Sequence, residues 1–164
     1  MGRTMRMTHT DRATGTVSLS LPVTVLLAAL AVPRVVVHDL GLAGPGPLNT
    51  LLVFLPPIVW LVVVLRARVT NPFFALLVVG LVYGLFLAAG HQLFWHETFG
   101  DDPPALGGNL AGALPAGLEV FVLRAFAVLS SIATGALVGA ITGAFGWALS
   151  KGLHAPRNRK RRSR

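Results

Sequence analysis

The stretch that decides the fold is Phe73–Gly90, which reads FFALLVVGLVYGLFLAAG and carries no charged side chain. About 20 apolar helical residues are needed to cross a bilayer core of about 30 Å. Three further apolar stretches occupy Val17–Val37, Leu48–Leu65 and Leu118–Leu149. We therefore predict an all-α, polytopic integral membrane protein, a bundle of four transmembrane helices over about 17–37, 48–65, 73–95 and 118–149.

Composition and segment lengths leave no room for a soluble domain. Of the 164 residues, 54% are hydrophobic and 12% are charged, against about 25% charged residues in soluble domains. The connections between the apolar stretches are shorter than the roughly 50 residues of a small domain. The sequence thus divides into a basic arm over 1–16, a transmembrane domain over 17–150 and a polybasic tail over 151–164.

Charged residues alternate in sign from one connection to the next. Basic residues flank the start of the first stretch, the second connection and the end of the fourth stretch, whereas acids lie in the other two connections. Because basic loops stay on the cytoplasmic side, both termini are predicted to be cytoplasmic. The basic positions are Arg3, Arg6, Arg12, Arg66, Arg68, Lys151 and the run 157–164, and the acidic positions are Asp39, Glu97, Asp101 and Asp102.

Most of the formal net charge of +8 lies in these basic segments. Anionic headgroups attract such segments, so we expect membrane lipid at the basic tail and no nucleic acid. Arginine outnumbers lysine twelve to two, and Ala, Gly, Val and Leu dominate, which is typical of a GC-rich bacterium and so favours a plasma (inner) membrane. The absence of cysteine excludes disulfides, thiolate metal sites and a cysteine nucleophile.

Small residues recur at every fourth position in the third and fourth stretches, a pattern known as a glycine zipper. Such ridges let two helix backbones approach closely inside lipid. We expect the third and fourth helices to pack on each other through them, with self-association between copies and a zipper-lined pore as alternatives. The ridge residues are Gly80, Gly84 and Ala88, and Ser131, Gly135, Gly139 and Gly143.

Two features of the sequence affect how the first two helices are interpreted: a pair of prolines and the pattern at the amino terminus. Pro56 and Pro57 lie inside the second stretch, where a missing N–H and a crowded preceding turn predict a kink. The first stretch has an alternative interpretation, in which residues 1–31 are a cleaved signal peptide ending at the small residues Ala29 and Ala31. Apolar residues continue past this point, which favours a retained helix.

Four charged residues are expected at similar depth near the non-cytoplasmic boundary: Arg34, Asp39, Glu119 and Arg124. Charges at this depth usually pair, because an unpaired charge is costly there. We predict contacts such as Arg34 with Glu119, or Arg124 with Asp39, that join the first and fourth helices.

Histidines and acids on the same face are weak candidates for a metal or proton-sensing site: His38, His91, His96 and Glu97. Imidazole and carboxylate together can bind zinc. However, His91 and His96 are five residues apart, which places them about 140° from each other around a helix. We therefore expect no bound metal, haem or other cofactor.

The sequence lacks the motifs of common enzymes. It has no GxSxG nucleophile context and no phosphate-binding glycine loop, and ionisable residues, which usually couple transport to ions, are nearly absent from the stretches. We predict a small non-enzymatic integral membrane protein, an accessory or assembly subunit or a homo-oligomer. The alternatives are a small channel, permease or holin-like pore, and an outer-face metal- or proton-sensing membrane protein.

Overall fold

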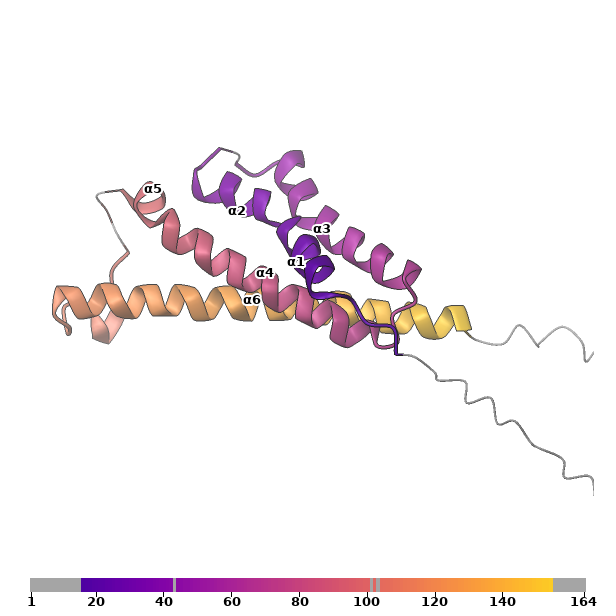
Figure 1. Ribbon diagram of the computed structural model, residues 1–164. Coiled ribbons are helices and arrows are strands. Elements are labelled where there is room, and N and C mark those ends of the chain that lie inside the picture. The colour runs from indigo at the N-terminus through magenta and orange to yellow at the C-terminus, as the bar shows by residue number, and fades with distance from the viewer. Residues whose placement is uncertain (1–15, 43, 101, 103, 155–164) are drawn as a thin grey trace, which may run out of the picture.

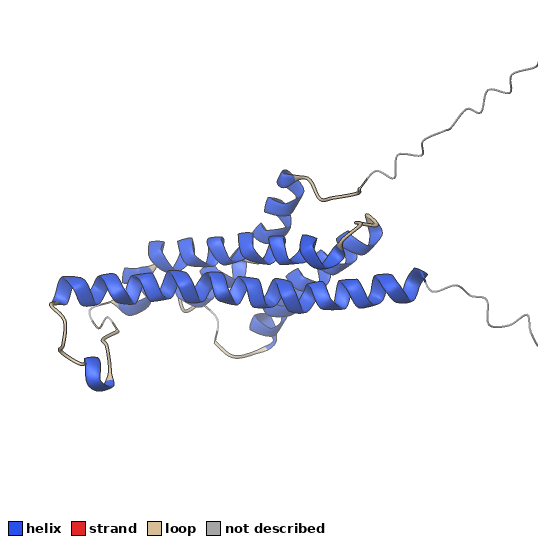
Figure 2. Cartoon of the chain, turned by 90° about the horizontal axis from the view of Figure 1, so that it is seen from below, coloured by secondary structure: helices blue, strands red, loops and turns tan. Residues whose placement is uncertain are grey.

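The structure, a computed structural model, describes residues 16–42, 44–100, 102 and 104–154. Regular structure in this part of the chain is entirely helical (Figures 1 and 2). Four spans, Leu21–Asp39, Pro47–Arg66, Pro72–Leu93 and Ala116–Leu153, are long and apolar enough to cross a membrane. This confirms the predicted all-α class with four candidate crossings. Most of the predicted basic arm and polybasic tail, residues 1–15 and 155–164, lies outside the described residues.

The first span is two short helices rather than the predicted continuous helix over 17–37. Helix α1 covers Leu21–Ala29 and helix α2 covers Val32–Asp39. Pro33 has no N–H for the carbonyl of Ala29, and its ring crowds the preceding turn. The backbone instead makes a tighter turn, in which the N–H of Ala31 donates to the carbonyl of Ala28 at 3.1 Å.

The second span, α3, runs from Pro47 to Arg66 as one helix, although Pro56 and Pro57 lie inside it. The chain then turns at Arg68, whose φ of 52° is left-handed. Helix α4, Pro72–Leu93, begins with proline in its first turn, and the Asn71 side chain accepts a hydrogen bond from the N–H of Phe74 at 3.1 Å. Proline and an Asn cap are strong helix-start signals, so this boundary lies within a residue of the predicted one.

After α4 come two short helices, α5 (Trp95–Phe99) and the 3₁₀ turn η1 (Gly108–Leu110), before the long helix α6. Helix α6, Ala116–His154, has 39 residues and is therefore about 58 Å long. It exceeds the predicted range 118–149 at both ends. In Figure 2, α6 extends past the other spans.

Helix α4 is the centre of the bundle. It contacts α6 on one side and α1, α2 and α3 on the other, while α3 also contacts α6 directly (Figure 1). Within its apolar span 44% of residues are buried, against 11% for α6. The largest fully enclosed side chains are Trp60, Leu76, Val35, Val64 and Val79.

The two ends of the bundle differ in charge. Val17 and Thr70 are joined by two hydrogen bonds of 2.9 Å, which tie the start of the described chain to the α3–α4 connection. Lys151 lines a pocket together with Thr70. We call this end, which carries Arg66, Arg68 and Lys151, the basic end, and the opposite end, which carries Asp39, Glu97 and Glu119, the acidic end.

Candidate functional site

The two small-residue ridges face each other across the α4–α6 interface. A Cβ added to Gly80 would collide with the backbone of Gly135 and Gly139, and one added to Gly135 would lie 2.5 Å from the Cα of Gly84. Such distances leave no space for a side chain, so the helix backbones are in direct contact. The structure therefore brings together the ridge residues for which this contact is predicted.

The remaining ridge residues extend the same interface. A Cβ added to Gly143 would lie 2.8 Å from the carbonyl oxygen of Phe73. The Ser131 hydroxyl donates to the carbonyl of Ala127 at 2.7 Å, and Ala88 is buried. The ridges are thus occupied within one chain.

At the acidic end, a carboxylate lies between two imidazoles. The Asp39 side chain is 1% exposed. Its Oδ1 lies 3.1 Å from Nδ1 of His38, and its Oδ2 lies 2.8 Å from Nδ1 of His91. The Thr98 hydroxyl donates to the Asp39 carbonyl at 3.1 Å. The cluster of Asp39, His38 and His91 therefore joins α2 to α4 and, through Thr98, to α5.

The directions of these hydrogen bonds follow from the chemistry of the groups. A carboxylate only accepts hydrogen bonds, so each imidazole donates from Nδ1. A cavity of about 490 Å³ adjoins the cluster and is lined on its other sides by apolar groups such as Trp95 and Phe126.

The predicted contacts Arg34–Glu119 and Arg124–Asp39 do not occur, because these side chains have other neighbours. The guanidinium of Arg124 donates to Oε1 of Gln92 at 3.2 Å and lies 4.8 Å from the centroid of the Trp95 ring. The Glu119 carboxylate accepts from the N–H of Leu106 at 2.7 Å.

Arg34 has a different environment. Among the described residues, its buried Nε has no hydrogen-bond partner. Arg34 lies beside Thr134 of α6, which is about 22 Å along that helix from Glu119, so the two charges are not at the same depth as predicted. The charges at this end hold α4 to α6 and to α2 rather than α1 to α6.

The other predicted metal candidates do not join the cluster. His96 and Glu97 are exposed on α5. Within the described part of the chain, no three His, Asp or Glu side chains are grouped so that they could hold a metal ion.

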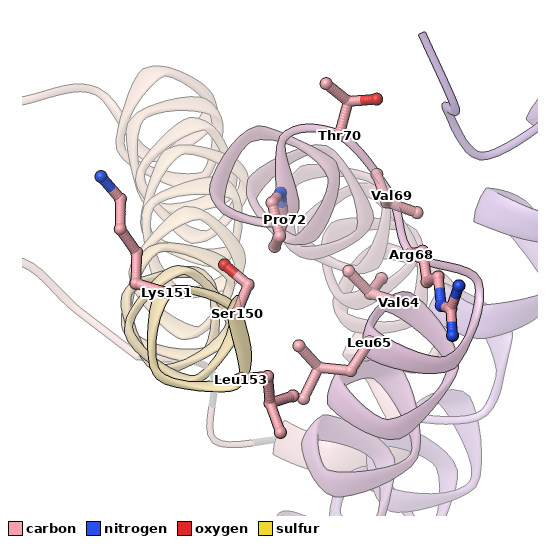
Figure 3. Close-up of a pocket in the computed structure, with 9 residues that line it drawn as sticks. All are labelled: Val64, Leu65, Arg68, Val69, Thr70, Pro72, Ser150, Lys151 and Leu153. Carbon is pink, nitrogen blue, oxygen red and sulfur yellow. The ribbon is translucent and has the colours of Figure 1, made fainter. Parts of the chain in front are cut away.

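The basic end has a pocket of its own, drawn in Figure 3, of about 330 Å³ between the ends of α3 and α6. Its centre is apolar, formed by groups such as Val64 and Leu153, whereas Arg68 and Lys151 lie at opposite rims and point outward. The Lys151 ammonium lies 5.0 Å from the centroid of the Trp147 ring. Two cations around an apolar floor are suited to the headgroup region of anionic lipid.

Three contributing residues were not singled out from the sequence. Trp60 is fully buried, and its indole N–H donates to the carbonyl of Leu27 at 2.6 Å. The Gln92 side chain accepts a hydrogen bond from Arg124, and the Thr98 hydroxyl donates one to the Asp39 carbonyl. The available signal was their polarity: a Trp, Gln or Thr inside or beside an apolar span needs a hydrogen-bond partner.

Comparison of the chain with protein-family models, curated proteins and solved structures finds no match.

Proposed function

We propose that this protein is a non-enzymatic integral membrane protein that acts as an accessory or assembly subunit of another membrane protein. The observation that carries the proposal is the surface of α6. Large apolar side chains on this helix are exposed along its whole length, including Phe121 at 67%, Leu129 at 68% and Leu153 at 74%. Part of this surface reaches beyond the rest of the bundle.

The length of α6 supports a protein partner in addition to lipid. Arg124 is level with Gln92 near the end of α4, and eight residues precede it in α6, which is about 12 Å of helix. At the other end α6 stays beside the rest of the bundle, because Leu153 lines the basic-end pocket together with Val64 and Leu65. Exposed apolar groups on the first extension, such as Phe121, are available to a partner.

The occupied ridges favour a different polypeptide over a second copy as the partner. Self-association through Gly135 and Gly139 requires the surface that α4 already covers. The same contact leaves no channel between α4 and α6, and no specific observation favours a pore.

We further propose that the protein lies in a bacterial plasma (inner) membrane with its basic end and both termini in the cytoplasm. The support is the positive charge of Arg66, Arg68 and Lys151 at one end and the known retention of basic loops on the cytoplasmic side. Anionic lipid headgroups at this end and at the basic tail are the proposed lipid contacts.

Photo-crosslinking in the native membrane tests the partner proposal. Benzoyl-phenylalanine replaces Phe121 or Leu129 on α6, and Phe74 on α4, which is 60% exposed, serves as the matched control. We expect one discrete crosslinked polypeptide from the α6 positions and none from the control. A ladder at multiples of 17.3 kDa would instead show a homo-oligomer, and crosslinks to lipid alone would refute the proposal.

A further inference from the structure

A small cavity lies among α2, α3, α4 and α6, separate from the acidic-end cluster and from the basic-end pocket. Its volume is about 170 Å³. Most of its lining is apolar, and three polar side chains complete it: Arg34 from α2, Tyr83 from α4 and Thr134 from α6. No carboxylate of the described chain lines this cavity.

Arg34 is a cation without a counter-ion in this cavity. Its Nε is enclosed and has no hydrogen-bond partner, and neither ion pair of the described residues involves its guanidinium. An uncompensated charge within a membrane-spanning helix is costly and is a mark of a functional site. The charge of this cavity suits an anion.

The two hydroxyls of the cavity point to the same ligand chemistry. Tyr83 is 6% exposed, and no hydrogen bond of its hydroxyl, or of the Thr134 hydroxyl, to another described residue is found. Hydroxyl and guanidinium groups are donors that suit a phosphate or carboxylate oxygen. One cation and two hydroxyl donors thus line a single cavity that has no carboxylate or amide side chain.

An apolar groove continues from this cavity toward the basic end. Val53, Pro57 and Val138 line both the cavity and a second hollow of about 330 Å³ between α3 and α6. The far part of the groove is lined by Leu61 and Phe145. Its one hydroxyl, on Thr142, already donates to a backbone carbonyl at 2.8 Å. Polar groups are therefore confined to the Arg34 end.

We propose that this composite site binds one anionic amphiphile, with a phosphate or carboxylate head against Arg34 and a single apolar chain in the α3–α6 groove. Charge complementarity selects the head, because the lining offers a cation and donors. The apolar groove selects a chain rather than a free anion. This site does not depend on the proposed protein partner.

Binding of dodecyl phosphate to the full-length protein in neutral dodecyl maltoside micelles tests the proposal. We expect saturable binding, weakened about tenfold or more in Arg34→Gln, because a hydrogen bond to a charged group is lost together with the charge. The exposed Thr134→Val change should weaken binding about fivefold. Arg66→Gln, an exposed cation at the basic end, is the matched control and should bind as the unmodified chain does.

Two further experiments test the contributions of the ligand's apolar chain and of its anionic head separately. Ile141→Trp fills the groove and should weaken dodecyl phosphate binding while leaving the weaker binding of inorganic phosphate unchanged. Neutral dodecanol should bind poorly. Mass spectrometry of protein extracted from its own membrane should show a bound anionic lipid that is absent from Arg34→Gln.

Three results would overturn the proposal: undiminished binding in Arg34→Gln, equal binding of dodecanol, or equal affinity for inorganic and dodecyl phosphate, which would indicate a free-anion site. If Arg34→Gln does not fold, Thr134→Val and Ile141→Trp decide the matter, since both positions are on the exposed surface. Undiminished binding in both of these variants would also overturn it.

Discussion

At the scale of single residues, Trp60 connects two structural features. The turn at Leu30–Ala31 diverts the N–H of Ala31 from the carbonyl of Leu27 to that of Ala28. The Trp60 indole supplies a donor to the Leu27 carbonyl at 2.6 Å. Its ring also meets the ring of Tyr83 edge-on, with centroids 6.0 Å apart. Trp60 thus stabilises the break in the first span.

Replacing Trp60 by phenylalanine should lower stability by about 1–3 kcal/mol, since the Leu27 carbonyl loses the shorter of its two hydrogen bonds and the core loses volume. The measurement is thermal unfolding in detergent. Trp147→Phe, at a position that is 52% exposed, should change the midpoint little. Equal shifts in both variants would show that the Trp60–Leu27 bond does not stabilise the bundle.

Asp39 is the second residue whose role is clear at this scale. Its buried carboxylate accepts hydrogen bonds from two imidazoles. The amide of Asp39→Asn has only one accepting oxygen, so at least one imidazole loses its acceptor. We expect a loss of about 1–3 kcal/mol. Glu97→Gln, an exposed acid on the neighbouring α5, is the control in the same unfolding assay. A destabilised control with an unaffected Asp39→Asn would contradict the assignment.

At the scale of elements, proline has opposite outcomes in two helices. Pro33 accompanies a break between α1 and α2, whereas α3 continues through Pro56 and Pro57. Pro56 is buried in the bundle, and neighbouring helices can hold a proline-containing helix together within a membrane. Tertiary packing therefore decides whether a proline interrupts a membrane helix.

The close α4–α6 contact predicts that a side chain added at one of its glycines destabilises the bundle. Gly135→Ala adds a Cβ 2.5 Å from the Gly84 backbone, which forces the helices apart. We expect a loss of about 1–3 kcal/mol, even though alanine gains about 1 kcal/mol of helix propensity over glycine. The same change at Gly117, in the first turn of α6, meets nothing within 4 Å and should be neutral or slightly stabilising. Thermal unfolding of the two variants reports the difference, and equal midpoints would argue against close packing.

At the scale of the whole molecule, the orientation in the membrane is testable because the chain has no cysteine. Single cysteines at Gly152 and at His96 mark the basic and acidic ends. In intact cells a membrane-impermeant maleimide should label His96→Cys, and Gly152→Cys should react only after the membrane is opened. The reverse pattern would place the basic end outside and refute the proposed topology.

The sequence by itself determined the number of spans and their approximate limits. Apolar length is a local property, and helix-start signals such as Asn71 and Pro72 act within one turn. The spacing of Gly80, Gly84, Gly135 and Gly139 also marked the surface on which α4 and α6 meet, because a period of four defines one helix face.

Only the tertiary structure decided which polar groups meet. The position of Asp39 between two histidines, the contact of Arg124 with Gln92 and Trp95, and the unpaired state of Arg34 depend on the rotation and tilt of separate helices. A few tens of degrees of rotation move a side chain from one neighbour to another without changing any apolar pattern. Charge pairing and cavity formation therefore depend on packing, whereas the candidate membrane spans were already defined by hydrophobic length.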